Sequence, residues 1–435
     1  MPLFETITDS HIAFLETLRH RFLDQVRIEA LSQFQSQGFP TKKDEEYKYT
    51  NLREVTEKEY NLFPSTHHSL DPKALEPYLL GEEHFDRIVF VNGILSKELS
   101  QISIENVEYM TFKHALNDSA YREVFEKYFN TIANRNLSFV NLNLAYFREG
   151  FFMKIPKNVV IEKPIHVFYF SQDQDFNTLY NTRNLLVVEE GAKVEVIESH
   201  HNLDERYVLT NSVTEIFTYP NAKADWHKLQ NDSEFAFLVD HTFAKQHTDS
   251  TATVNTFSFG GKLTRNNLDF IQDGENIHSF MNGITIIGGQ QLVDHHTAVH
   301  HNQPHCESYQ NYKGIFKDQA HGVFNGKVFV DKLAQKTNAY QQNNNVLLSE
   351  GASIDTKPQL EIFADDVKCS HGCTVGQLNN DALFYLQARG ISKKEAQALL
   401  LYAFANDAME NIDIEPLKNK ISDLLAEKLE VSISL

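Results

Sequence analysis

The segment from 151 to 375 constrains the fold most, because it contains no convincing helical period. It consists of short runs of β-forming residues that Gly, Asn or Asp interrupt, such as PIHVFYF, NLLVVEEG and AKVEVIES. It holds 12 of the 18 glycines but only five of the 11 prolines. Tight turns need glycine, and the hydrogen-bond ladders of a sheet exclude proline. The middle of the chain is therefore predicted to be all β.

Two parts of this region resemble each other, LLVVEEGAKVEVIE at 185–198 and VLLSEGASIDTKPQLEIF at 346–363. Each reads as a strand, a Glu-Gly-Ala turn and a second strand, which favours a stacked solenoid. The polar run at 341–345 (QQNNN) suits side-chain ladders between turns. A β-sandwich or double jelly roll remains the rival architecture. The open ends of a solenoid need caps, and helical termini are natural caps.

Helical patterns flank and interrupt the β region. Apolar residues recur near a 3.6-residue period over 10–37, so we predict one amphipathic helix whose apolar face contains Ile12, Leu15, Leu18, Phe22, Val26 and Phe34. Gly38 and Pro40 follow as stop signals. A second helical pattern at 119–135 predicts an insertion between strands.

The C-terminal region reads as a helical unit over 391–430. Ser392 and Glu395 form a capping box, and the last helix has Pro416 in its first turn. We therefore divide the chain into an N-terminal helical region (1–85), a β core (86–385) and a C-terminal helical domain (386–435).

Composition restricts the class of protein. The net charge is −19, and without a basic patch such a surface repels nucleic acid and anionic lipid. The longest apolar runs are far shorter than the roughly 20 residues that span a bilayer, and the first residues do not resemble a signal peptide. Three cysteines give no disulfide scaffold and fit a reducing compartment. We expect a soluble cytoplasmic protein that binds neither nucleic acid nor membranes.

Common catalytic motifs are missing. Two segments, GGKLT at 260–264 and GVFNGKV at 322–328, imitate phosphate loops but do not match the Walker A spacing or open a helix. The sequence also lacks a G-x-S-x-G elbow and an H-E-x-x-H motif. We therefore do not expect an enzyme that hydrolyses nucleotides, esters or peptides.

A histidine-rich segment, VDHHTAVHHNQPHC, runs from Val293 to Cys306. Imidazole and thiolate are good ligands for transition metals, but adjacent residues of a strand point to opposite faces. His296 and His300 would share a face about 13 Å apart, too far for one ion. We therefore favour hydrogen-bonded structural histidines between His295 and His305 over a metal site.

The sharpest local feature is DDVKCSHGCTV at 365–375. In an extended segment, Cys369, His371 and Cys373 project from the same face. Cys369 and His371 would lie about 7 Å apart at Cα, near enough to share an ion or cluster, whereas a Cys369–Cys373 disulfide would span too far. The alternative to a metal or cluster site is a buried strand face on which the histidine makes one hydrogen bond. Two or three soft ligands do not complete a site, so a second chain would have to supply the rest.

The run at 341–405, with ADDVKCSHG and FYLQARGI, resembles the SufB/SufD family of the SUF iron–sulfur cluster assembly system, and its SufD branch in particular. SYQNYKGIF at 308–316 and DEEYKYTNL at 44–52 resemble two further family segments, with Tyr47 where tryptophan is more usual. The resemblance spans nearly the whole chain and is most specific over 308–405. It implies a right-handed parallel β-helix core flanked by helical N- and C-terminal domains.

The resemblance also implies a non-enzymatic scaffold. Chains of this branch pair with a SufB-like paralogue through the β-helix and dock a SufC-like ABC ATPase through the C-terminal helical domain. A transient iron–sulfur cluster forms at the heterodimer interface, and the family motif places His371 there, with Cys369 beside it. Cys373 receives no role, because small residues are common at that position. The sulfur-transfer cysteines of SufB chains are missing, which favours the SufD branch.

Two function hypotheses remain. The first is the iron–sulfur assembly scaffold, and the second is a stand-alone metal-binding or carbohydrate-acting β-helix protein with a complete site in one chain. The sequence does not determine whether the isolated chain forms a homodimer, whether flavin binds the complex, or which ligands complete the cluster site.

Overall fold

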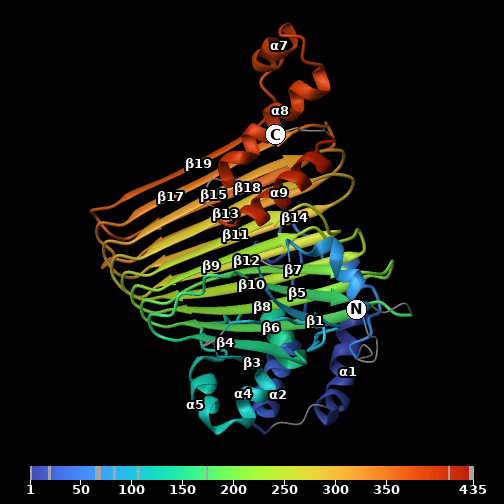
Figure 1. The fold of residues 1–435 in the computed structure, drawn as a ribbon, viewed down its shortest axis with the longest axis vertical. Coiled ribbons are helices and arrows are strands. Elements are labelled where there is room, and N and C mark those ends of the chain that lie inside the picture. The colour runs from blue at the N-terminus through green and yellow to red at the C-terminus, as the bar shows by residue number, and fades with distance from the viewer. Residues whose placement is uncertain are drawn as a thin grey trace.

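The computed structural model describes residues 2–17, 21–63, 70–81, 85–104, 108–172, 175–409 and 412–430. Its core is a β-solenoid in which the chain passes alternately between two sheets of stacked strands (Figure 1). The ten-stranded sheet contains, in spatial order, β19 (Lys368–Gly376), β17 (Asn338–Leu347), β15 (Glu307–Phe316), β13 (His278–Ile287), β11 (Thr251–Ser258), β9 (Lys223–Gln230), β7 (Lys193–Asn202), β5 (Ile165–Ser171), β1 (Asp86–Val91) and β2 (Ile94–Leu95). The nine-stranded sheet contains β18 (Ser353–Ile362), β16 (His321–Val330), β14 (Leu292–His301), β12 (Leu263–Gln272), β10 (Ala236–Gln246), β8 (Val208–Thr218), β6 (Thr178–Val188), β4 (Gly150–Ile155) and β3 (Glu108–Thr111).

The strand register confirms the solenoid and rules out the β-sandwich. From β4 and β5 onward, every pairing is parallel, and equivalent residues recur about every 30 positions, as in Thr178 and Val208. Only the two short outermost pairs, β1–β2 and β3–β4, are antiparallel. The two similar segments are not equivalent by position. The first crosses from β6 to β7, whereas the second crosses from β17 to β18 at the opposite corner.

One corner of the solenoid demands a left-handed backbone residue in each turn. The residues at this corner have φ between 56° and 70°; they are Asn158, Gly191, Asn221, Asp249, Asn276, His305 and Lys336. Each donates its backbone N–H to a carbonyl of the adjacent turn, for example Asp249 to Glu275 at 3.0 Å. Asn, Asp and Gly tolerate this conformation best, which explains why they punctuate the strands.

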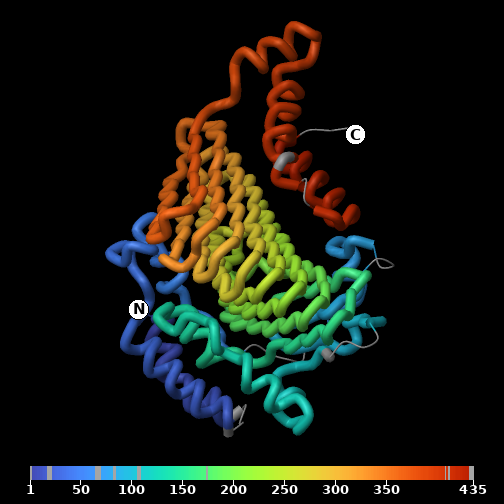
Figure 2. The backbone as a smooth tube through the Cα atoms, turned by 90° about the vertical axis from the view of Figure 1, so that its left-hand side faces the viewer, coloured from blue at the N-terminus to red at the C-terminus, as the bar shows by residue number. Residues whose placement is uncertain are grey.

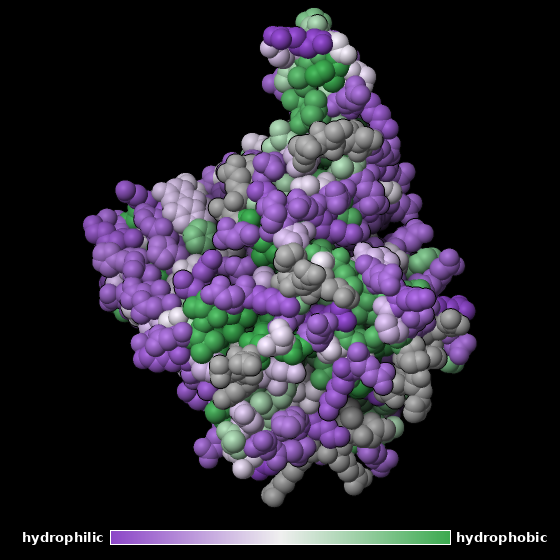
Figure 3. Space-filling model, viewed as in Figure 1, coloured by the Kyte–Doolittle hydropathy of each residue, from purple (hydrophilic) through white to green (hydrophobic). Residues whose placement is uncertain are grey.

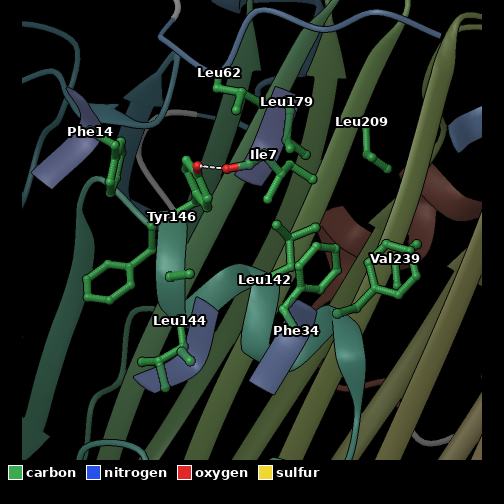
Figure 4. Packing of buried hydrophobic residues seen from close by; sticks show 14 of the residues in the cluster. Ile7, Phe14, Phe34, Leu62, Leu142, Leu144, Tyr146, Leu179, Leu209 and Val239 are labelled. Atoms are coloured by element: carbon green, nitrogen blue, oxygen red, sulfur yellow. Dashed lines mark hydrogen bonds between the residues drawn. The ribbon is translucent and has the colours of Figure 1, made fainter. Parts of the chain in front are cut away.

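The N-terminal helices cover the outer face of the nine-stranded sheet, except η2 (Pro72–Tyr78), which packs on the ten-stranded sheet through Leu75 and Tyr78. They are α1 (Pro2–Thr17), α2 (Arg21–Gln37), η1 (Glu45–Tyr47), α3 (Arg53–Thr56), η2 (Pro72–Tyr78), α4 (Phe112–Asn117), α5 (Ser119–Tyr128) and α6 (Ser138–Tyr146). Figure 4 shows α1, α2 and α6 packing against the strands through residues such as Ile7, Phe34, Leu142 and Leu209. The Tyr146 hydroxyl donates to the Ile7 carbonyl, which ties α6 to α1.

The C-terminal helices follow the solenoid, and all of them except the first cover the other sheet. They are α7 (Asn380–Ala388), α8 (Lys393–Asn406), η4 (Asp407–Met409) and α9 (Glu415–Lys428). Leu401 of α8 and Ile421 of α9 pack with Ile284 and Ile315 of the ten-stranded sheet. Figure 2 shows these helices alongside the solenoid, with α7 projecting beyond its last strands. The capping box is present, since the Glu395 N–H donates to the Ser392 hydroxyl at 3.2 Å, and Pro416 lies in the first turn of α9.

The sequence analysis was wrong about the extent of three helical features. The single helix predicted over 10–37 is two helices, α1 and α2, and residues 18–20 lie outside the described residues. The helix predicted over 119–135 ends at Tyr128, and buried α6 follows it unpredicted. The C-terminal helices do not cap the solenoid, because no residue of β18 or β19 is buried. No helix in the described parts of the chain is long and apolar enough to cross a membrane.

Candidate functional site

The candidate site lies on β19, the last strand of the ten-stranded sheet. β19 pairs in parallel with β17, so that Cys369 is opposite Ala339, His371 opposite Gln341 and Cys373 opposite Asn343. These three β17 partners are buried. Because side chains of stacked parallel strands point the same way, Cys369, His371 and Cys373 all face the interior of the solenoid at its open end. The shared face predicted from the sequence is therefore confirmed.

Cys369 is the most enclosed of the three residues. It is half-buried and packs against a small cluster that includes Val328, Val330 and Ala339. Burial raises the pKa of the Cys369 thiol, so the isolated chain keeps it protonated at neutral pH. A metal ion or a cationic partner group nearby would be needed to favour the thiolate.

His371 and Cys373 are exposed at the mouth of the solenoid. The Cys373 sulfur lies 2.8 Å from the Thr356 hydroxyl on β18, so the two sheets meet through this pair. Within the described chain, His371 makes no hydrogen bond or ion pair, unlike the histidines of the solenoid interior. An imidazole with both nitrogens available is suited to bind a metal or a partner group.

The site is incomplete within the described residues. No group of three or more His, Cys, Asp or Glu side chains there has an arrangement that could hold a metal ion. Iron–sulfur clusters are held mainly by several thiolates. One strand therefore supplies at most part of a ligand set, and the open edge beside it is where the remainder could enter.

The histidine-rich segment forms β14 and the following corner, and its histidines are structural. His295 faces inward and lies 2.9 Å from the Thr285 hydroxyl, and buried His301 lies 2.9 Å from the Ser308 hydroxyl. Burial lowers the pKa of His295 to about 4, so it stays neutral. His300 stacks on Phe329 with ring centroids 4.7 Å apart. The alternation of faces is confirmed, and the contacts of His295, His300 and His301 fit the structural interpretation.

The segment at 44–52, DEEYKYTNL, forms a strap across the outer face of the nine-stranded sheet. Tyr47 is buried under the strap, with its ring 3.8 Å from the Arg265 guanidinium carbon of β12. The Thr50 hydroxyl donates to Asp294 of β14. The motif could be identified in the sequence, but its contacts with Arg265 and Asp294 could not be predicted from it.

The strap continues toward the open end through charged contacts. His296 of β14 lies 3.1 Å from a carboxylate oxygen of Glu46, and Lys327 of β16 donates to the same carboxylate. Lys357 of β18 pairs with Glu45. The His296 hydrogen bond and the Lys327 ammonium hold the pKa of Glu46 down, to about 2. The strap thus links four successive turns, ending at an exposed edge strand.

The two segments that imitate phosphate loops do not open helices, as predicted. Gly260 and Gly261 turn directly into strand β12, and the segment at 322–328 lies inside β16. Neither opens a helix. The polar run of β17 does form ladders, since the Gln341 side-chain amide donates to Gln310 of β15 at 2.8 Å.

Comparison with known proteins agrees with this architecture. Residues 169–404 match the family model described as SUF system FeS cluster assembly, SufBD core domain, and residues 4–167 match the SufBD protein N-terminal region. The chain belongs to the SufBD family. It is thus a SUF-system protein of iron–sulfur cluster assembly, as the sequence resemblance indicated.

The similarity to SufBD relatives covers most of this chain and most of each relative. An iron–sulfur cluster assembly SufBD family protein of Synechocystis is 34% identical over 88% of this chain and 86% of its own length. The iron–sulfur cluster assembly protein SufD of Escherichia coli is 30% identical over 92% and 91%. SufD of Bacillus subtilis is 26% identical over 94% of each. Proteins named SufD are therefore homologues of this SufBD chain over nearly its full length.

Proposed function

We propose that this chain is a non-enzymatic scaffold subunit that pairs with a SufB-like β-helix chain, docks a SufC-like ATPase and holds a transient iron–sulfur cluster at the paired interface. The observation that carries the proposal is the open edge of β19, where Cys369 and His371 face a site that one chain does not complete. The three free cysteines suit the reducing cytoplasm, where we place this activity.

The geometry of the open end supports pairing with another β-helix. β18 and β19 are ten and nine residues long, and none of their residues is buried. Unpaired N–H and C=O groups along such edges pair readily with the strands of another chain. When the SufB-like partner is absent, the same edges are suited to a second copy of this chain, so we expect a homodimer of the isolated protein.

We assign His371 and Cys369 as the ligands that this chain contributes to the cluster. Both side chains come from one face of β19, and imidazole and thiolate suit iron. The partner must supply sulfide and further thiolates. The cluster is cargo under assembly, which fits a site that exists only in the complex.

The C-terminal helices support docking of an ATPase subunit. Phe384 and Tyr385 of α7 are 73% and 57% exposed, and Leu399 of α8 is 42% exposed. Figure 3 shows hydrophobic surface gathered where α7 and α8 project from the solenoid. Exposed aromatic residues on a projecting helix are typical of protein interfaces.

The docking proposal is tested by co-purification of a SufC-like ATPase with full-length variants. We expect Phe384→Asp to weaken capture of the ATPase by at least about tenfold, because an exposed aromatic anchor typically contributes 2 kcal/mol or more. Leu333→Asp is the matched control, since Leu333 is 67% exposed on a corner of the solenoid. Equal capture by both variants would place the ATPase elsewhere. Deletion of α8 and α9 is unsuitable, because it would uncover the apolar sheet beneath them.

The scaffold function itself is tested by anaerobic co-expression with SufB-like and SufC-like chains. We expect one complex that accumulates an iron–sulfur chromophore, whereas the chain alone accumulates none. A stable chromophore or a carbohydrate-cleaving activity in the chain alone would favour the stand-alone alternative.

A further inference from the structure

A groove rich in lysine lies where the C-terminal helices meet one corner of the solenoid. It consists of two adjoining cavities of about 420 and 250 Å³ that share Ile286, Lys317 and Lys428. Its floor comes from the turns that follow β13 and β15, and its wall comes from the last turn of α9. Neither the iron–sulfur site on β19 nor the exposed face of α7 contributes to it.

The charge of this groove contrasts with the rest of the protein. Four lysines line it, namely Lys262, Lys317, Lys394 and Lys428. Among the lining side chains, lysines outnumber carboxylates four to two, since the lining carboxylates are Glu234 and Glu430, in a chain with a net charge of −19; Asp318 and Glu427 lie beside the groove. Asp318, on the neighbouring turn, accepts the Gly289 N–H at 2.9 Å. A net-negative protein that gathers lysines in one concavity creates a local field that attracts anions.

The four lysines differ in the contacts that they make within the described residues. Lys317 donates to the Lys428 carbonyl at 3.3 Å, and Glu430 lies 3.8 Å from Lys317 and 3.3 Å from Lys394. By contrast, the ammonium groups of Lys262 and Lys428 form no ion pair there. Burial lowers the pKa of Lys428; the nearby Glu427 carboxylate opposes this shift, and the Lys317 charge adds to it.

Lys262 belongs to GGKLT, the segment that imitates a phosphate loop. The structure shows why hydrolysis is not expected, since this turn opens β12 and not a helix. This turn nevertheless places Lys262 in the cavity. Leu292, 30 residues later, begins β14, the strand stacked on β12. Lysines act as point-charge donors to phosphate oxygens, and compact multiply charged anions best match several ammonium groups.

We propose that this groove binds a small phosphate-bearing anion, which links Lys262 and Lys317 of the solenoid to Lys428 of α9. The volume suits a ligand of this size, because small-molecule sites typically occupy about 300 to 1,000 Å³. A ligand that bridges the two parts stabilises the packing of α9 on the sheet. The inference goes beyond the scaffold function and needs no partner chain.

Titration of the full-length chain with inorganic pyrophosphate, by calorimetry and thermal unfolding at fixed ionic strength, tests the proposal. We expect one saturable site and a rise in Tm of a few degrees near saturation. Lys428→Met and Lys262→Gln should each weaken pyrophosphate binding by about tenfold or more. Lys262 belongs to a turn of the solenoid and not to α9, so its variant remains informative if the Lys428 variant unfolds.

Lys193→Gln is the matched control, because it removes the same charge from an exposed lysine at a different cavity. It should leave pyrophosphate binding unchanged. An equal loss in all three variants would reveal diffuse attraction and overturn the site. Absence of saturable binding would overturn it too, and equal binding of sulfate would overturn the assignment to phosphate-bearing ligands.

Discussion

A substitution of His371 best distinguishes a cluster-binding role of β19 from a purely structural role. It is exposed and, within the described chain, unbonded, so His371→Ala should change the free energy of unfolding by no more than about 0.5 kcal/mol. Loss of the proposed ligand should nevertheless reduce cluster formation by roughly tenfold or more, because the loss of even a supporting group lowers the metal affinity of a site by about that factor. Visible iron–sulfur absorbance per assembled complex, measured with Tm, checks this prediction.

Cys373→Ala provides the comparison on the same strand. It removes the contacts with Thr356 and Asn343 but no assigned ligand, so chromophore yield should fall much less. A large drop in Tm for His371→Ala would indicate a structural histidine instead. Unchanged absorbance and unchanged Tm would remove His371 from the site.

Glu46 makes the strap sensitive to acid. Its folded pKa of about 2 lies below the ordinary 4.5, so its ion pairs stabilise the fold above about pH 4.5 and lose this effect as the pH falls toward 2. Because the side chain is 39% exposed, solvent screening limits the effect to about 1 kcal/mol. Glu46→Gln should lose that stability at pH 7, and the difference from wild type should vanish near pH 2.

Urea unfolding across this pH range measures the effect. Glu45→Gln is the control, since it breaks only the exposed pair with Lys357 and should leave stability nearly unchanged. A constant difference between wild type and Glu46→Gln at every pH would mean that the lost contacts are not ionic.

Residues on strands were more predictable from the sequence than their partners. The two-residue period alone placed Cys369, His371 and Cys373 on one face and split the histidines of β14 between two faces. The same reasoning could not connect Glu46 with Lys327, because their contact joins residues 281 positions apart. Only the stacking of turns brings that lysine beneath the strap.

At the scale of elements, the left-handed corner sets a test of the turns. Asn276 has φ 56° and donates its N–H to the Pro304 carbonyl. A β-branched side chain is strained in this conformation, so Asn276→Val should destabilise the protein by about 1–2 kcal/mol. Asn276→Gly keeps the backbone conformation and should cost clearly less, although both variants lose the side-chain bond to Asp249. Equal losses in urea unfolding would assign the effect to that bond.

Helical elements show where sequence patterns reach their limit. Periodicity predicted a helix over 10–37 but assigned Ile12 to the buried face, whereas Ile12 is 75% exposed and Phe14 is buried. The chain forms two helices there, so one continuous period does not apply. Helix α6 escaped detection because it is buried on nearly all sides and therefore lacks a polar stripe.

For the whole molecule, the two ends of the solenoid differ. At the N-terminal end, the sheets finish in short antiparallel strands, β2 with two residues and β3 with four, which blunt the edges. At the other end, β18 and β19 are the outermost strands, and within the described residues no further strand pairs with their long edges. An assembly through one open end closes as a pair and does not extend into a fibre.

The final prediction follows from this asymmetry. Ile362 of β18 is 39% exposed at the open end, so Ile362→Glu should place a charge in the paired interface and reduce association by at least about tenfold. Val160→Glu is the matched control, because Val160 is 46% exposed far from that edge. Light scattering should give pairs for the control, separate chains for Ile362→Glu and no larger polymers. Pairing that survives Ile362→Glu with full affinity would mean that the solenoid associates through a different surface.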